Sequence, residues 1–127
     1  MKAYSTAAGA AAFMLLSAVA AAITWHVDPV HSVALFKVQH LGAGYTWGVF
    51  TDISGSVTFA EDKPEESSIE MVVKTDSLNT FNAARDKHLK NADFFEVETY
   101  PEMSFKSTAW KKIGEDTFEV AGDFSLH

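Results

Sequence analysis

The sequence predicts an all-β domain made of antiparallel strands, with one short helix at about residues 82–90. Two observations support this prediction: apolar and polar residues alternate with a period of two in several short segments, and turn-forming residues separate those segments. Strands with a single apolar face are typical of antiparallel sheets, which keep one face dry and expose the other. A length of 127 residues is enough for one domain.

The predicted strands follow one another from residue 33 onward. Residues 33–40 form the first, with Ala34, Phe36, Val38 and His40 on one face. The later strands cover residues 55–59, 69–76, 103–109 and 117–126, and the apolar residues that share a face within them are Val57, Phe59, Ile69, Met71, Val73, Met103, Phe105, Ala109, Phe118, Val120, Phe124 and Leu126. A charged turn that contains Pro64 precedes the strand at 69–76.

One segment departs from this alternation. Residues 82–90 contain helix formers and no β-branched residue, and Asn82 is a suitable N-cap. Pro101 marks the return to extended chain. We therefore expect a single short helix between two β regions.

The first 22 residues have the pattern of a secretory signal peptide. Lys2 is followed by an apolar stretch at residues 7–19 and by small residues at 20–22, where a signal peptidase would cleave. An uncleaved membrane anchor is the alternative, but the stretch is rich in alanine, which spans membranes poorly compared with leucine. We expect an exported protein that resides in the periplasm.

Composition excludes several function classes. The chain has 10 Lys and Arg against 17 Asp and Glu, a formal charge of −7, so it would repel nucleic-acid phosphates. The absence of cysteine excludes disulfides, CxxC redox chemistry, thiolate zinc sites and a cysteine nucleophile. Nucleic acid is therefore not an expected partner.

No motif in the sequence predicts catalysis or metal binding. The spacing of His26, His31, His40 and His88 matches no metal-ligand pattern, and the chain has no GxSxG, Walker or GxGxxG motif. The polar segment 85–88 is explained equally well as a solvated helix face or as a polar lid over a cavity. The Phe94–Phe95 pair that follows would either pack on the domain or gate an apolar cavity, because exposed phenylalanine rings are costly.

Several segments in order resemble the YceI-like family of bacterial periplasmic proteins. These segments are Asp28-Pro29-Val30-His31-Ser32, residues 36–42, Gly48-Val49-Phe50, residues 55–59, Arg85-Asp86-Lys87-His88-Leu89, Asp93-Phe94-Phe95-Glu96-Val97, Tyr100-Pro101, residues 105–108 and Gly122-Asp123-Phe124-Ser125-Leu126. The resemblance implies an antiparallel, lipocalin-like β-barrel over residues 23–127, with an isoprenoid or other long-chain amphiphile in its lumen. It also implies that further strands follow residue 127, so we expect this domain to be incomplete at its C-terminus.

The candidate site follows from the resemblance and from the apolar faces of the strands. The residues expected to line the lumen are Phe36, Val38, Phe50, Phe59, Met103, Phe105, Val120 and Phe124. Arg85, His88 and His40 are expected at its mouth, where they would meet a ligand head group. We expect no metal and no cofactor other than a bound isoprenoid or quinone-like lipid.

The sequence is compatible with three functions for this domain. The leading hypothesis is a periplasmic lipid carrier rather than an enzyme. The first alternative is an acidic interaction module for a membrane redox protein, with a purely structural core and salt-sensitive binding. The second is an enzyme that uses His40 or His88. The sequence leaves the oligomeric state open, with a dimer as one alternative.

Overall fold

The computed structural model describes residues 21–127, and the signal-peptide prediction for residues 1–22 therefore falls almost wholly outside the described residues. The strands are β1 (Ile23–His26), β2 (Ala34–His40), β3 (Gly44–Phe50), β4 (Ile53–Phe59), β5 (Ser68–Lys74), β6 (Leu78–Asn79), β7 (Glu102–Lys112) and β8 (Phe118–Ser125). The helical elements are α1 (Ala83–Leu89) and two 3-10 turns, η1 (Pro64–Glu66) and η2 (Thr75–Ser77). The prediction of an antiparallel all-β fold with one short helix is confirmed.

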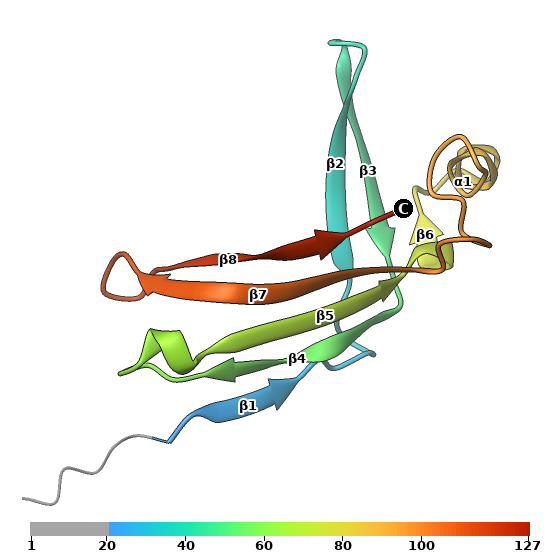
Figure 1. Ribbon diagram of the computed structural model, residues 1–127. Helices are drawn as coiled ribbons and strands as arrows, with labels where there is room; N and C mark the ends of the chain where they lie inside the picture. Colours follow the sequence, from blue (N-terminus) through green and yellow to red (C-terminus); the bar gives the residue numbers. More distant parts are fainter. Residues whose placement is uncertain (1–20) are drawn as a thin grey trace, which may run out of the picture.

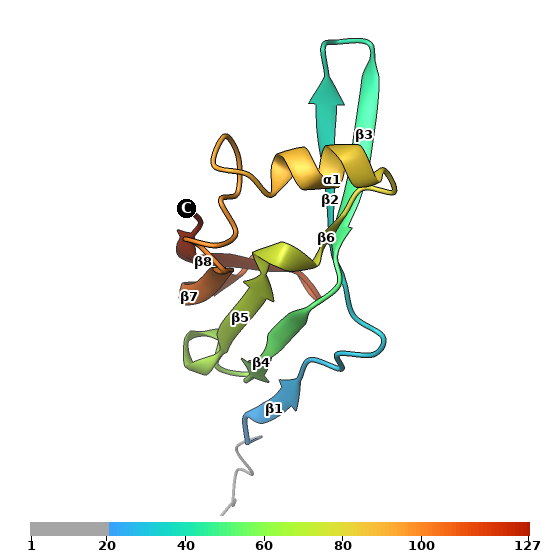
Figure 2. The same ribbon diagram turned by 90° about the vertical axis from the view of Figure 1, so that its right-hand side faces the viewer.

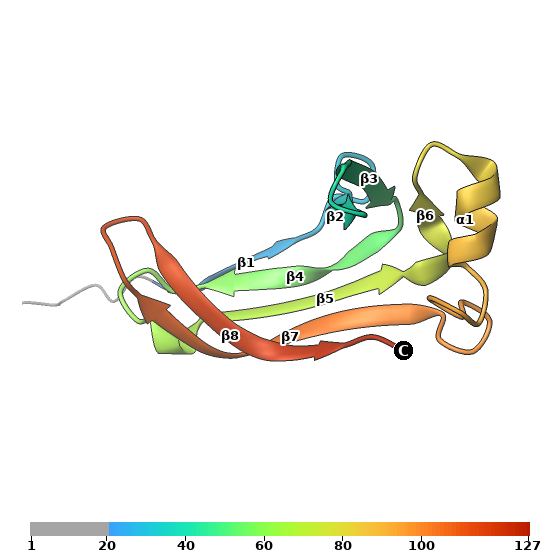
Figure 3. The ribbon, with the colours of Figure 1, turned by 90° about the horizontal axis from the view of Figure 1, so that it is seen from above.

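The strands form two antiparallel sheets. The larger sheet has the order β1-β4-β5-β7-β8, and the smaller has the order β2-β3-β6. Figure 1 shows the β2–β3 hairpin rising away from the larger sheet. The view from above in Figure 3 places β2, β3, β6 and α1 together near one end of that sheet. The described part of the larger sheet is thus covered at one end.

The helix begins where the sequence predicts it. The Asn82 side chain accepts a hydrogen bond from the Arg85 backbone N–H at 3.0 Å, which satisfies one of the free donors of the first turn. In Figure 2, α1 lies in front of the β2–β3 hairpin and above the end of the larger sheet. No helix within residues 21–127 is long and apolar enough to cross a membrane.

Several details of the strands differ from the predictions: β1, β3 and β6 are not among the predicted strands, and two further differences affect the site. The strand expected at 69–76 ends at Lys74, because Thr75–Ser77 turns into η2 and directs the chain toward the smaller sheet. In β7, the pairing with β8 shifts between Ser107 and Ala109. A bulge of this kind reverses the alternation of side chains beyond it. Trp110, rather than Ala109, therefore shares a face with Phe105.

The core is small and lies where the two sheets approach each other. Phe50, Val73 and Leu78 are buried, and they come from β3, β5 and β6. The Phe50 ring lies 5.5 Å from the Phe36 ring and 5.5 Å from the Phe95 ring, measured between centroids. This core forms the floor on which the candidate site is built.

Candidate ligand-binding cavity

A cavity of about 770 Å³ lies between the two sheets. One wall is the inner face of the β2–β3 hairpin, the opposite wall comes from β5, β7 and β8, and the third comes from α1 and the loop after it. The lining residues are Ala34, Leu35, Phe36, Val38, His40, Thr46, Phe50, Met71, Val73, Thr80, Arg85, His88, Leu89, Phe94, Phe95, Met103, Ser104, Phe105, Phe124 and Leu126. Cavities of this size hold small organic ligands.

The two walls differ in chemistry. The larger sheet contributes only apolar side chains apart from Ser104, whereas the hairpin, the β6–α1 connection and α1 supply His40, Thr46, Thr80, Arg85 and His88. The cavity is also open, since Val38 is 55% exposed and Phe124 is 62% exposed. An apolar wall opposite a partly polar one suits a ligand with a long tail and a polar head.

Two glycines keep the cavity from being filled by side chains. Gly48 pairs with Phe36 across β2 and β3, and a Cβ at Gly48 would overlap the Phe36 ring and lie 2.9 Å from the Thr80 methyl group. A Cβ at Gly122 would lie 2.5 Å from Cζ of Phe105. Both rings therefore lie against the sheets, over positions that carry no side chain, instead of extending across the cavity.

Arg85 is held by a polar network at the cavity wall. Its Nε donates to Oγ1 of Thr80 at 2.8 Å, and its Nη2 donates to the Thr80 carbonyl at 2.7 Å. Oδ1 of Asp86 accepts from the Thr80 hydroxyl at 2.5 Å and from the Thr80 backbone N–H at 2.8 Å. These hydrogen bonds, led by the one from the hydroxyl, lower the pKa of Asp86 below its ordinary value of 3.8. The network fixes α1 to the end of β6.

The two histidines expected at the mouth both line the cavity but lie on different walls. His88 belongs to α1; its ring stacks edge-on against Phe94 at 5.1 Å, and its Nε2 lies 3.9 Å from Oδ2 of Asp93. His40 is the last residue of β2, next to the hairpin tip. Arg85, His88 and His40 therefore border one cavity from two elements.

The structure brings most of the residues expected to line the lumen together. Phe36, Val38, Phe50, Met103, Phe105 and Phe124 line the cavity, whereas Phe59 and Val120 do not. Strand pairing places these two residues beside partners that also lie outside the cavity: Phe59 is opposite Ile23, and Val120 is opposite Trp110. Both positions lie on the expected face of the larger sheet but farther along the strands, at the end away from the hairpin.

Sequence reasoning left out several lining residues from the candidate site. Met71 and Val73 lie on the apolar face predicted for residues 69–76, so the same alternation could have placed them in the site. Thr80 and Leu89 had no such signal, because they reach the cavity through the turn before α1 and through the helix itself.

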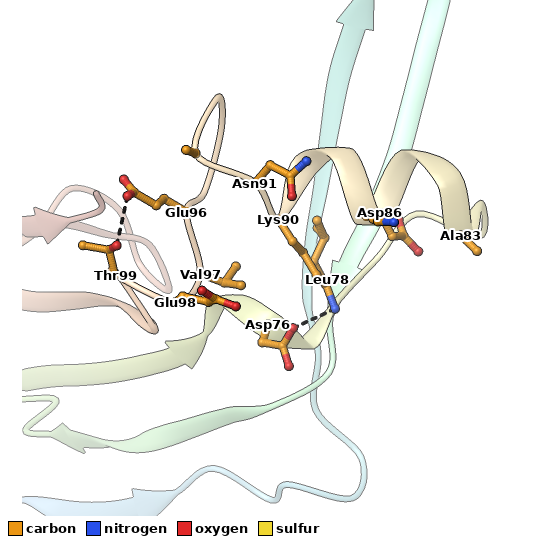
Figure 4. Close-up of a pocket in the computed structure, with 12 residues that line it drawn as sticks. Asp76, Leu78, Ala83, Asp86, Lys90, Asn91, Glu96, Val97, Glu98 and Thr99 are labelled. Carbon is orange, nitrogen blue, oxygen red and sulfur yellow. Dashed lines mark hydrogen bonds and ion pairs between the residues drawn. The ribbon is translucent and has the colours of Figure 1, made fainter.

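A second cavity of about 680 Å³ contacts a different face of α1 (Figure 4). Two interactions cross its lining: Lys90 Nζ lies 2.9 Å from Asp76 Oδ1, and the Thr99 hydroxyl donates to Glu96 Oε1 at 2.9 Å. Within the part of the chain that the structure describes, no group of three or more His, Asp or Glu side chains is arranged to hold a metal ion.

Comparison with known proteins identifies the family. The model of the YceI-like domain matches residues 25–127. The chain belongs to the YceI-like family. The YceI-like chain is 42% identical over 120 residues to a UPF0312 protein of Photorhabdus laumondii, covering 94% of this chain and 62% of that protein. It is 46% identical over 97 residues to a UPF0312 protein of Pseudomonas savastanoi, covering 76% of this chain and 50% of that protein.

Solved structures agree with the YceI-like fold. BcnA of Burkholderia cenocepacia matches with a TM-score of 0.74 at 25% identity, over 79% of this chain and 62% of BcnA. The YceI protein of Campylobacter jejuni matches with a TM-score of 0.62 at 31% identity, over 79% of this chain and 58% of that protein. The YceI-like chain thus spans about half to three-fifths of the length of the relatives it matches.

Proposed function

We propose that this YceI-like domain binds an isoprenoid-type or other long-chain amphiphilic lipid in the cavity between its sheets, and that it serves as a periplasmic carrier rather than an enzyme. The observation that supports the proposal most strongly is the apolar wall formed by β5, β7 and β8. Met71, Val73, Met103, Phe105 and Phe124 from this wall present apolar surface to the cavity. An alkyl or prenyl tail has no hydrogen bonds to satisfy, so it suits such a wall.

The length of the ligand follows from the energetics. Each buried CH2 contributes about 0.8 kcal/mol. Association costs about 4–15 kcal/mol in lost translational and rotational freedom. A tail of about ten buried carbons contributes about 8 kcal/mol, which offsets only part of that range. Long chains are therefore favoured over short ones.

The head group is assigned to the side of the cavity that α1 and the hairpin border. Arg85 already donates two hydrogen bonds to Thr80, so it acts as a fixed positive charge rather than as a mobile clamp. His40 and His88 add polar ring nitrogens on two different walls, the hairpin and α1. A quinone-type carbonyl or another neutral acceptor group suits this environment. Periplasmic residence follows from the predicted signal peptide.

The first test is mass spectrometry of an organic extract from the purified protein, compared with a mock purification. A stoichiometric long-chain lipid is expected, and its mass would name the ligand class. An empty extract, together with no uptake on incubation with isoprenoid lipids, would contradict the carrier function and favour the interaction module.

Phe124→Asp tests the location of the tail. The side chain is 62% exposed, so the substitution spares the core, yet it places a carboxylate against the apolar wall. We expect retention of lipid to fall about tenfold or more, because burying an unpaired charge is costly. Ile113→Asp is the matched control, since Ile113 is 57% exposed and lies outside the cavity. Equal retention by both folded variants would exclude this cavity as the tail site.

A further inference from the structure

The β2–β3 hairpin exposes apolar side chains on the face opposite the cavity. Cross-strand pairs place Lys37 beside Trp47 and Gln39 beside Tyr45, and the residues of each such pair point to the same side of the hairpin. Tyr45 is 59% exposed and Trp47 is 50% exposed. We call this face, together with the preceding Val33, the outer face of the hairpin.

The tip of the hairpin is equally apolar. Leu41, which is 89% exposed, begins the turn after β2. Its φ of 47° lies in the left-handed region, where asparagine and glycine are favoured and leucine is not. The turn therefore holds a fully exposed leucine in a conformation that leucine disfavours, which local folding preferences do not explain.

Charge separates this hairpin from the rest of the molecule. The chain carries 17 Asp and Glu, yet none lies between Asp28 and Asp52. Lys37 is the one Lys or Arg in that interval, and its Nζ lies 4.5 Å from the Tyr45 ring centroid and 5.4 Å from that of Trp47. An acidic protein thus presents a projecting, acid-free and weakly basic hairpin (Figure 1).

We propose that the outer face and tip of this hairpin dock on the surface of an anionic phospholipid bilayer. Tryptophan and tyrosine favour the membrane–water interface, a tip leucine gains from entering the acyl region, and a lysine stem can lie along apolar surface while its ammonium reaches lipid phosphates. A protein partner or a second copy of the chain suits the patch less well, because lysine is depleted at the centre of protein interfaces.

This docking goes beyond the proposed function and does not depend on it. The inner face of the same hairpin forms one wall of the cavity, so a docked hairpin would hold the cavity opening close to the bilayer. Since no Asp or Glu lies between Asp28 and Asp52, the docked hairpin would bring no carboxylate of its own against the anionic lipids.

The test uses the full chain, vesicles of phosphatidylethanolamine with phosphatidylglycerol, and brominated lipids that quench nearby tryptophan fluorescence. Trp25→Phe with Trp110→Phe leaves Trp47 as the reporter of the hairpin. Trp47→Phe with Trp110→Phe leaves Trp25, which is 51% exposed in β1 and close to the N-terminal residues. We expect stronger quenching of Trp47 than of Trp25. Equal or stronger quenching of Trp25 would overturn the proposal, since the N-terminal segment would then carry the binding.

A pair of substitutions tests the tip. Leu41→Asp removes the exposed leucine and suits the left-handed turn, so the hairpin should remain folded. We expect vesicle binding to weaken about tenfold or more. Val30→Asp is the control, because Val30 is also exposed, at 80%, but lies in the loop before β2. Equal weakening of vesicle binding by both variants would overturn the proposal in favour of general charge repulsion. Shielding of Trp47 in the absence of vesicles, together with a doubled mass in sedimentation, would overturn it in favour of self-association.

Discussion

The end of the molecule near the hairpin and the far end of the larger sheet both carry aromatic residues but use them differently. Near the hairpin, Phe36 and Phe105 lie over Gly48 and Gly122, and the opposing layer leaves a cavity between them. At the other end, Phe59, Trp110 and Phe118 contact one another, with ring centroids 5.1 to 6.2 Å apart. We call these three residues the distal cluster.

The comparison shows that an apolar face does not by itself make a binding cavity. The cavity end has glycines beneath its rings and a second sheet opposite, so the rings are held apart. In the distal cluster, the cross-strand partners of Phe59, Trp110 and Phe118 are Ile23, Val120 and Lys112, which all carry side chains, and the rings pack together. The Nε1 of Trp110 is buried there without a hydrogen-bond partner, so the distal cluster offers this N–H no polar group.

Phe50→Ala should produce the largest effect and tests whether the cavity floor is the main core. Phe50 is 4% exposed and contacts Phe36 and Phe95, so its truncation should lower the free energy of unfolding by about 3–5 kcal/mol. Phe59→Ala is the counterpart in the distal cluster, where the ring is only partly buried, and we expect about 1–3 kcal/mol. Urea denaturation followed by tryptophan fluorescence measures both. Equal losses would mean that the two ends share the core evenly.

Gly48→Ala tests whether glycine keeps the Phe36 ring against the sheet. The added methyl group would collide with the ring and with Thr80, and we expect a loss of about 1–3 kcal/mol of stability together with weaker lipid uptake. Gly44→Ala, in the same strand, meets no atom within 4 Å and should change stability by less than about 0.5 kcal/mol. If the two variants unfold at the same urea concentration, the close contact between Gly48 and Phe36 is not what shapes this wall.

Asp86→Asn tests the polar network of Thr80, Arg85 and Asp86 at the cavity end. Because folding lowers the pKa of Asp86 below 3.8, the carboxylate stabilises the fold above that value and loses this effect as the pH falls through its lower folded-state pKa. Asn keeps an acceptor oxygen but loses the charge, so we expect a deficit of about 1 kcal/mol. The gap between the proteins should be fully developed above the ordinary pKa of 3.8 and should close as the pH falls below it. A gap that stays constant across this range would contradict the assigned role of the carboxylate.

The sequence predicted the faces of the strands better than their positions. Phe105 and Phe124 lie in the cavity because their strands keep the expected alternation up to the Ser107/Ala109 bulge. Phe59 and Val120 lie on the same face but outside the cavity, because alternation gives no information on which stretch of a strand another layer covers. Trp110 replaces Ala109 on this face because a single unpaired residue reverses the alternation, and the sequence contained no signal for it.

The sequence alone therefore determined the all-β class, the start of the helix at Asn82, the apolar faces and the family. These properties depend on neighbours a few residues apart, such as the period of two in a strand and the cap of a helix. Tertiary structure decided which part of the larger sheet faces the hairpin and how Arg85 and Asp86 meet at Thr80. It also decided that Phe36 lies over Gly48. These contacts depend on strand register and on how two layers pack, which local alternation does not encode.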